Sequence, residues 1–354
     1  MPVLVQSEKE QQQAGGGLRV RSADGSRPEL VIGLLNNMPD AALEATERQF
    51  RMLLSAASAG IGVRLLLCRM PSVPRSEAAE AHLRRSYVGI DSVPDTEIDG
   101  LIVTGREPLT ADLHDEPYWD SFVRVLEWSR ERTASTIWSC LAAHAAVLHL
   151  NGIQRVRSQH KHCGVFDCSR ASDHALVAHV PERFRMPHSR WNGLPQDGLT
   201  RAGYEVLALA GDAGVDCFLR HAEGESLFLF FQGHPEYQPD TLLLEYRRDL
   251  LRYLRREAVA WPGTPRGMLA PKDEAALQDI RSEAHRLPEE ETLARLSGLF
   301  SAAGIENGWH ATATTIYRNW LEYLLAQKVH RSASRESAAM SPTGQGRLEE
   351  RSFA

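Results

Sequence analysis

The sequence predicts an α/β fold in which a mostly parallel sheet is flanked by helices on both faces. Short apolar runs within residues 30–35 and 99–105 are typical of strands buried on both sides. These runs alternate with segments, such as residues 41–57 and 118–133, whose apolar residues recur at helical spacing. Alternation of this kind implies right-handed βαβ crossovers, which bring the carboxyl ends of the parallel strands to one edge.

The individual elements follow from the same patterns. We expect strands at residues 30–35, 61–68, 99–105, 134–139, 205–209, 215–219 and 226–231. Helices are expected at residues 41–57, 76–86, 118–133, 241–256 and 312–329, directly after Cys140, and as one or two surface helices within 273–299. Residues 152–195 show no regular pattern and are interpreted as a substrate-covering loop.

The composition is that of an ordinary soluble protein, and the length allows one large α/β core or two modest ones. We expect a disordered lead-in at residues 1–27, a single domain at 28–330 with an inserted helical segment at about 271–307, and a disordered tail at 331–354. The net charge of −6 argues against a nucleic-acid partner. No apolar run is long enough to cross a membrane, and the start of the chain has no signal-peptide pattern, so a cytoplasmic location is expected.

Residues 134–146 predict a nucleophile elbow at Cys140. A short buried strand ends at this cysteine, and a helix rich in alanine begins immediately after it. A side chain at such a corner stands above the sheet edge, close to the free N–H groups of the helix. These groups and the positive end of the helix dipole favour a thiolate, which makes Cys140 the candidate nucleophile.

A candidate base and its partner follow a later strand. The apolar run of residues 226–231 ends at Gln232-Gly233-His234-Pro235-Glu236-Tyr237. A thiol nucleophile needs a base that accepts and returns its proton, and the base needs an acceptor that fixes its tautomer. A lone cysteine or histidine is usually structural. Three such residues at strand ends favour a catalytic set of Cys140, His234 and Glu236.

Backbone N–H groups, other cysteines and histidines, and arginines also bear on the predicted site. The backbone N–H of Leu141 and the turn at Gly105 and Arg106 are candidates for an oxyanion hole. The cysteines and histidines between residues 160 and 174 match no zinc spacing, and no metal or other cofactor is expected. The five cysteines of the chain are scattered and predict reduced thiols. One arginine of residues 241–256 would be enough to hold a substrate carboxylate.

Several of these motifs together resemble the homoserine O-succinyltransferase family. They are Leu34-Leu35-Asn36-Asn37-Met38-Pro39, the strand at residues 99–105, the Cys140 elbow, Pro187-His188-Ser189-Arg190, Gly233-His234-Pro235-Glu236-Tyr237 and Asn319-Trp320-Leu321. The resemblance runs in the same order from about residue 30 to residue 327. It implies a layered, flavodoxin-like fold related to class I glutamine amidotransferases.

The resemblance also implies an activity. Members transfer an acyl group from an acyl-CoA to the hydroxyl of homoserine by a ping-pong mechanism, early in methionine synthesis. Carried over by position, Cys140 is the acyl-thioester nucleophile, His234 the base and Glu236 its partner. Lys161, Ser189 and Arg248 match substrate-contacting positions, and a homodimer is usual in the family.

The chain departs from the family pattern at several positions. The two lysines expected after Asn-Leu-Met-Pro are absent, Leu141 replaces a tryptophan and His144 replaces a glutamine. The turn associated in the family with the choice between succinyl-CoA and acetyl-CoA contains Arg106 here. These differences indicate a divergent branch and leave the donor open between succinyl-CoA and acetyl-CoA. The family resemblance alone favours succinyl-CoA as the partner of L-homoserine.

Three alternatives stay open from the sequence. A glutaminase-type amidohydrolase would use the same cysteine, histidine and glutamate, although glycines normally flank its cysteine, where Ser139 and Leu141 stand here. A related amino-acid hydroxyl, such as that of serine, would serve equally as acceptor. A binding protein without catalysis is disfavoured because Cys140, His234 and Glu236 are all present.

Overall fold

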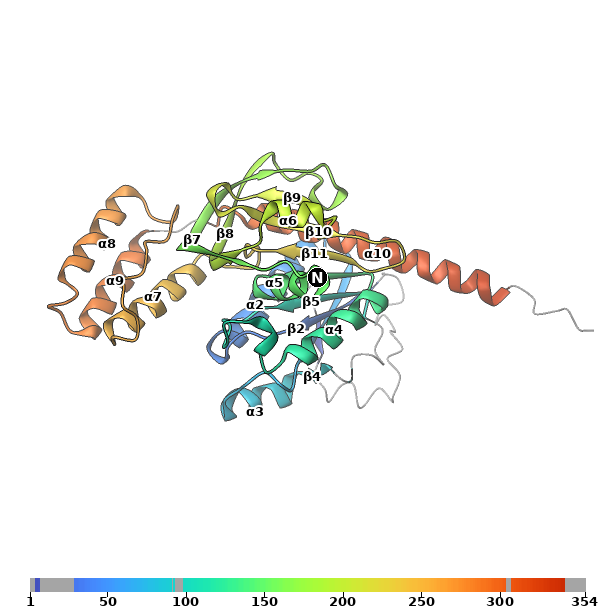
Figure 1. The fold of residues 1–354 in the computed structure, drawn as a ribbon, viewed down its shortest axis with the longest axis horizontal. Coiled ribbons are helices and arrows are strands. Elements are labelled where there is room, and N and C mark those ends of the chain that lie inside the picture. Colours follow the sequence, from blue (N-terminus) through green and yellow to red (C-terminus); the bar gives the residue numbers. More distant parts are fainter. Residues whose placement is uncertain (1–3, 7–28, 91, 93–97, 304–306, 341–354) are drawn as a thin grey trace, which may run out of the picture.

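A computed structural model describes residues 4–6, 29–90, 92, 98–303 and 307–340, and all structural statements refer to these residues. Their strands form one 11-stranded sheet in the order β1-β3-β2-β5-β6-β11-β10-β9-β7-β8, with β4 paired to β3 outside this path. Helices lie on both sides of the sheet (Figure 1). The predicted α/β class with a flanked, mostly parallel sheet is therefore confirmed for the half of the sheet that carries the elbow.

The parallel half consists of the apolar runs recognised in the sequence and two short strands that were not predicted. Its members are β1 (Leu4–Gln6), β2 (Glu29–Leu35), β3 (Gly62–Arg69), β4 (Val88–Gly89), β5 (Gly100–Thr104), β6 (Ser135–Ser139) and β11 (Leu227–Phe231). All five residues of β5, β6 and β11 are buried. Burial on both faces explains why these strands are continuous apolar runs.

The other half of the sheet is antiparallel and corrects one expectation. Residues 152–195 are not a loop, because most of them form the long ribbon of β7 (Val156–Arg170) and β8 (Arg183–Gly193). β9 (Glu205–Leu209) and β10 (Val215–Arg220) join this ribbon to β11. Much of β7 is exposed or half-buried, so its sequence lacks the apolar run by which a buried strand is recognised.

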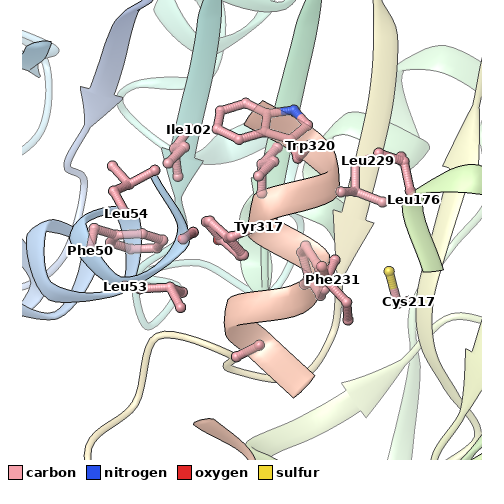
Figure 2. Packing of buried hydrophobic residues seen from close by; sticks show 14 of the residues in the cluster. Phe50, Leu53, Leu54, Ile102, Leu176, Cys217, Leu229, Phe231, Tyr317 and Trp320 are labelled. Atoms are coloured by element: carbon pink, nitrogen blue, oxygen red, sulfur yellow. The ribbon is translucent and has the colours of Figure 1, made fainter. Parts of the chain in front are cut away.

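Two layers of helices cover the parallel strands. α2 (Leu43–Ala57) and α10 (His310–Met340) pack on one face, and α4 (Trp119–Arg132) and α5 (Leu141–Asn151) on the other. Shorter helices are α3 (Glu77–Ser86) and α6 (Gln196–Arg201). Figure 2 shows Tyr317 and Trp320 of α10 packed among side chains from α2 and the sheet, which anchors this C-terminal helix in the core.

A second helical group lies beside the sheet. α7 (Thr241–Leu254), α8 (Pro271–Glu283) and α9 (Glu289–Ala303) pack around their own cluster, which includes Tyr246, Leu250 and Leu296 (Figure 1). The insertion expected at residues 271–307 therefore consists of two helices that extend α7 away from the sheet. Residues 304–306 lie outside the described part.

Both predicted disordered ends need correction. Residues 4–6 of the expected lead-in form β1 and pair with β3, and the remainder of that lead-in lies outside the described residues. α10 continues through Met340, ten residues into the predicted tail, because the chain has no proline or glycine between residues 310 and 340. Residues 341–354 are outside the described part. None of the described helices is both long and apolar enough to span a membrane.

Candidate active site

Cys140 stands at a strained corner between β6 and α5. Its backbone has φ 53° and ψ −113°, a conformation rarely adopted by residues with a side chain. Its N–H donates to the carbonyl of Phe231 at 2.7 Å, which ties the corner to the end of β11. The predicted elbow is therefore present, and it holds the half-buried sulfur at the carboxyl edge of the parallel strands.

The carboxyl ends of the neighbouring strands meet at the same edge. The Asn37 N–H donates to Thr104 Oγ1 at 2.8 Å, which joins the ends of β2 and β5. Gly105 lies against the start of α5, since a Cβ built on it would be 2.6 Å from the backbone nitrogen of Leu141. The first N–H groups of a helix have no partner within the helix. The turn therefore packs directly against the start of the helix that follows Cys140, so both groups of candidate oxyanion donors lie beside each other.

His234 and Glu236 form a buried pair directly after β11. His234 Nδ1 lies 2.8 Å from Glu236 Oε1, and their side chains are 6% and 5% exposed. Burial alone would lower the pKa of His234. The charges of Glu236 and Cys140, and the hydrogen bonds of both groups to the ring, instead raise this pKa well above its usual value.

Cys140 and His234 follow neighbouring strand ends, because Ser139 pairs with Phe231 and the Cys140 N–H donates to the Phe231 carbonyl. The interaction with Cys140 that helps to raise the pKa of His234 agrees with this neighbourhood. A histidine beside a thiol can accept its proton, and a carboxylate on the other ring nitrogen keeps the ring oriented. The structure therefore brings together the three residues that the sequence proposed as a catalytic set. The arrangement can support attack by sulfur on a carbonyl carbon, followed by proton transfer to the leaving group.

The three predicted substrate-contacting residues also come together, around two acidic side chains of α7. Lys161 Nζ donates to Asp249 Oδ2 at 2.7 Å, and Ser189 Oγ donates to Glu245. Arg248 donates to Asp249 Oδ1 from Nε at 3.0 Å and from Nη2 at 2.8 Å. The cations Lys161 and Arg248 are thus both held by the carboxylate of Asp249.

Tyr237 links this group to the catalytic histidine. Its ring stacks on His234 with centroids 4.1 Å apart, and its hydroxyl donates to Glu245 Oε1 at 2.6 Å. Burial, and then the charges of Glu245 and Glu236, raise the pKa of Tyr237, so the phenol keeps its proton. The nucleophile, the base and the polar group on α7 therefore form one continuous site.

Arg106 lies in the turn after β5, and two of its guanidinium nitrogens have no hydrogen-bond partner among the described residues. Its Nε and Nη1 atoms are buried and make no hydrogen bond to any described residue. Glu116 fixes the far side of this turn, because its Oε1 accepts from the N–H groups of Leu109 and Thr110 at 2.6 and 2.9 Å. An arginine with unused donors suits a carboxylate of a ligand.

The cysteines and histidines between residues 160 and 174 form no common centre. His160, His162, Cys163 and Cys168 are distributed along β7. Within the described part of the chain, the one group of three possible metal ligands with atoms inside 4.8 Å of one another is Cys168, His188 and Asp216. Only Cys168 belongs to the cluster that the sequence suggested.

Known proteins with similar sequences give the family. The family model for homoserine O-succinyltransferase matches residues 19–331. A homoserine O-succinyltransferase of Rhodopseudomonas palustris is 46% identical over 309 residues, which cover 87% of this chain and 92% of that protein. One of Bradyrhizobium japonicum is 43% identical over 314 residues, which cover 88% and 94%. The chain belongs to the homoserine O-succinyltransferase family.

Membership of this family confirms the resemblance seen in the sequence and makes the protein an acyltransferase. A solved structure of a glutamine amidotransferase from Methylobacillus flagellatus aligns with a TM-score of 0.46 at 13% identity, over 84% of this chain and 96% of that one. A glutamine amidotransferase of Thermotoga maritima aligns with a TM-score of 0.42 at 10% identity, over 84% and 98%.

Several polar residues of the site in this homoserine O-succinyltransferase family member were not predicted from the sequence. Glu245 and Asp249 are spaced i and i+4 and share one face of α7 with Arg248 nearby, which is a usable signal. Tyr237 directly follows Glu236 in the motif already singled out. Gln232 begins the same motif, and its Oε1 lies 2.9 Å from His144 Nε2, which ties α5 to the end of β11.

Proposed function

We propose that the protein transfers the succinyl group of succinyl-CoA to the side-chain hydroxyl of L-homoserine, through an acyl thioester on Cys140. The observation that carries this proposal is that Cys140 and the buried His234–Glu236 pair follow the adjacent ends of β6 and β11, which the Cys140 N–H joins by its bond to the Phe231 carbonyl. No cofactor besides the acyl-CoA cosubstrate is needed, because nucleophilic substitution and proton transfer are the whole chemistry.

The first half-reaction loads the enzyme. The Cys140 thiolate attacks the thioester carbonyl carbon of the donor, and the negative charge moves onto the carbonyl oxygen. The N–H groups at Leu141 and in the Gly105 turn stabilise this oxygen. As the tetrahedral intermediate collapses, the bond to the CoA sulfur breaks and His234 gives its proton to that sulfur. Succinyl-Cys140 and free CoA result.

The second half-reaction unloads it. An alcohol is a poor nucleophile at neutral pH, so His234, now neutral, takes the proton of the homoserine hydroxyl as its oxygen attacks the thioester. The carbon–sulfur bond then breaks, and the Cys140 thiolate and the imidazolium are restored. Glu236 keeps the ring oriented and stabilises its positive charge in each cycle.

The charged groups around the catalytic set suit the two substrates. Arg248 can take the homoserine carboxylate in a two-pronged contact if it exchanges Asp249 for the substrate. Glu245, already an acceptor for Ser189 and Tyr237, can accept from the ammonium group. Arg106 offers its unused donors to the distal carboxylate of a succinyl group, which acetyl-CoA lacks.

The chain is proposed to act early in methionine synthesis, in the cytoplasm. The described cysteines are all free thiols, which agrees with a reducing compartment. The homodimer implied by the family resemblance stays a prediction.

The proposal is tested by intact-mass spectrometry of protein mixed with succinyl-CoA in the absence of acceptor. We expect one succinyl group on Cys140, its removal when L-homoserine is added, and no adduct in a Cys140→Ala variant. Cys163→Ala is the matched control, because Cys163 is also half-buried and is expected to leave loading intact. A panel of donors and acceptors in the same assay includes acetyl-CoA and serine.

Two results would contradict this proposal. Turnover of glutamine without any acyl adduct would instead identify an amidohydrolase. Transfer that persists in Cys140→Ala would remove the thioester from the mechanism.

A further inference from the structure

A cavity of about 310 Å³ adjoins the helix that begins after Cys140, and the mechanism above gives it no role. Its walls are the turn after β5, the side of α5 and the segment that leads into β7. The lining includes Ala111, Asp112, Leu113, His144, Leu148 and Arg155. Since one water molecule takes up about 30 Å³, the space is large enough for part of an organic ligand.

His144 offers this cavity an unpaired hydrogen-bond acceptor. Gln232 Nε2 donates to the carbonyl of Val215 at 2.7 Å and its Oε1 accepts from the N–H of Leu194 at 3.0 Å, which fixes the orientation of the amide. His144 Nε2 lies 2.9 Å from the same Oε1 and therefore carries the ring proton. Burial lowers the pKa of His144 to about 3, so the ring is neutral and its Nδ1 is a bare acceptor. This buried Nδ1 has no hydrogen-bond partner among the described residues.

Arg155 offers a hydrogen-bond donor to the same space. Its Nη2 donates to the carbonyl of Ala111 at 3.3 Å, which holds the guanidinium against the turn after β5. Its Nη1 is buried and forms no hydrogen bond within the described part of the chain. Because a buried polar atom without a partner is unfavourable, Arg155 Nη1 and His144 Nδ1 both favour a ligand that supplies the missing hydrogen bonds.

The charges and the apolar surface of the cavity favour a neutral ligand over a small anion. The carboxylate of Asp112 lines the same space as the guanidinium of Arg155, and the two opposite charges attract each other. The buried side chains of Leu113 and Leu148 add apolar surface. A matching ligand therefore carries a carbonyl oxygen for Arg155, an N–H or O–H group for His144, and methylene or methyl groups.

The cavity also lies beside the elements that hold the proposed nucleophile and base. The N–H of His144 donates to the carbonyl of Cys140 at 3.3 Å, and the two residues are four positions apart, or about 6 Å along the axis of α5. Gln232, bonded to the His144 ring, begins the catalytic loop, residues 232–237. The turn after β5 packs against the start of α5. His144 thus brings the cavity to within one helical turn of Cys140.

We propose that this cavity binds the pantetheine arm of the acyl-CoA donor, with Arg155 donating to an amide carbonyl and His144 accepting from an amide N–H or from the hydroxyl. The arm is neutral and consists of amide groups, a hydroxyl, and apolar methylene and methyl groups, which matches the lining. This inference rests on the proposed acyl transfer from a CoA thioester to Cys140. Binding of this non-reacting part of the donor positions the thioester and so accelerates loading.

The test compares the rates at which three succinyl thioesters load Cys140, followed by rapid quenching and intact-mass spectrometry. Succinyl-CoA carries the whole donor, succinyl-pantetheine lacks the nucleotide, and the S-ethyl thioester of succinic acid lacks the arm as well. Arg155→Gln should slow loading by succinyl-CoA and by succinyl-pantetheine about tenfold, because one hydrogen bond from a charged group is lost. Loading by the S-ethyl thioester should stay unchanged.

A second variant, Ala111→Phe, tests the space rather than the hydrogen bond. Ala111 is exposed and lines the cavity, so a phenyl ring in its place should fill the room that the arm needs. We expect it to slow the two pantetheine donors at least as strongly as Arg155→Gln does and to spare the S-ethyl thioester. Arg132→Gln is the control for the loss of a positive charge, because Arg132 ends α4 before β6, whereas Cys140 follows β6 at the other edge of the sheet. It should leave all three rates unchanged.

Several results would overturn the proposal. Equal losses with all three donors would place the effect at Cys140 rather than at the arm. A loss in Arg155→Gln with succinyl-CoA alone would mean that Arg155 contacts the nucleotide phosphates, and unchanged loading by succinyl-CoA in both folded variants would show that the donor does not use the cavity. A wild-type protein that none of the three donors loads would instead reject the proposed acyl transfer itself.

Discussion

Replacing Gly105 by alanine should disable acyl transfer without touching any of the proposed catalytic side chains. The new Cβ would lie 2.6 Å from the backbone nitrogen of Leu141 and 2.8 Å from that of Ala142. Since non-bonded heavy atoms prefer separations of about 3.5–4 Å, the turn and the helix must move apart by roughly 1 Å. The displaced atoms are those that would bind the oxyanion.

The size of the effect follows from that displacement. A misplacement of about 1 Å in a catalytic site can cost about 100-fold in rate, and the loss of one oxyanion donor costs about 10²–10³-fold. We therefore expect the rate of Cys140 succinylation to fall by about 10²–10³-fold. Gly105 has no positive φ, so the change acts through crowding rather than backbone strain.

The assay compares two reactions of the same sulfur. Succinylation by succinyl-CoA passes through an oxyanion, whereas alkylation by iodoacetamide is a displacement at saturated carbon and forms none. Rapid quenching and mass spectrometry give both rates. In Gly105→Ala the succinylation rate should fall and the alkylation rate should stay within a factor of about three, well below the 10²-fold effect of a lost oxyanion donor.

Gly298→Ala is the matched control. No atom lies within 4 Å of a Cβ built on Gly298 in α9, so this change should stabilise the helix by about 1 kcal/mol and leave both rates unchanged. Wild-type succinylation by a folded Gly105→Ala protein would refute the packing of this turn against the nucleophile helix. An equal loss of both rates would show that the effect lies in Cys140 itself.

Three further predictions concern the acceptor, the donor turn and acid stability. Arg248→Lys should raise the KM for homoserine more than 10-fold and leave donor loading unchanged, because a two-pronged contact worth about 1.5–3 kcal/mol is lost; unchanged acceptor kinetics would reject this contact. Glu116→Gln should slow loading by succinyl-CoA more than alkylation of Cys140, because two backbone donors of the turn lose a carboxylate acceptor; equal effects would argue against a donor site there. His144 has its pKa lowered to about 3 by burial, so between about pH 6.5 and pH 3 the unfolded chain binds a proton that the folded chain refuses. Stability should therefore fall with falling pH in that window, by up to about 1.4 kcal/mol per unit, and urea unfolding of His144→Gln should show a smaller fall.

Much of the parallel sheet could be predicted because its information is local. A strand buried on both faces must be apolar at every position, as in β5 and β6. The ribbon of β7 and β8 was missed because its residues are largely polar and partly exposed. Its pairing, such as Cys163 opposite Ser189, joins residues 26 positions apart (189 minus 163). Such pairing leaves no short-range periodicity in the sequence.

Some residues of the candidate site could likewise be predicted from the sequence, and others could not. Cys140, His234 and Glu236 could be named because each directly follows a recognisable strand, and the edge shared by parallel strands brings such positions together. Glu245, Asp249 and Tyr237 were missed because their importance lies in contacts with Ser189, Lys161 and His234. The spacing of Glu245 and Asp249 on α7 indicates a shared helix face but not which partners that face contacts.

The sequence by itself determined the α/β class, the position of the elbow and the residues that meet at its edge, since buried strands and a small-residue helix have compositions that no exposed segment shares. Only the tertiary structure decided which charged groups compensate one another. Arg190 and Asp216 are 26 residues apart (216 minus 190), yet they lie on either side of His188 beneath the catalytic loop. Their charges act through space at close range, and the distance through space is set by the packing of strands rather than by the order of residues.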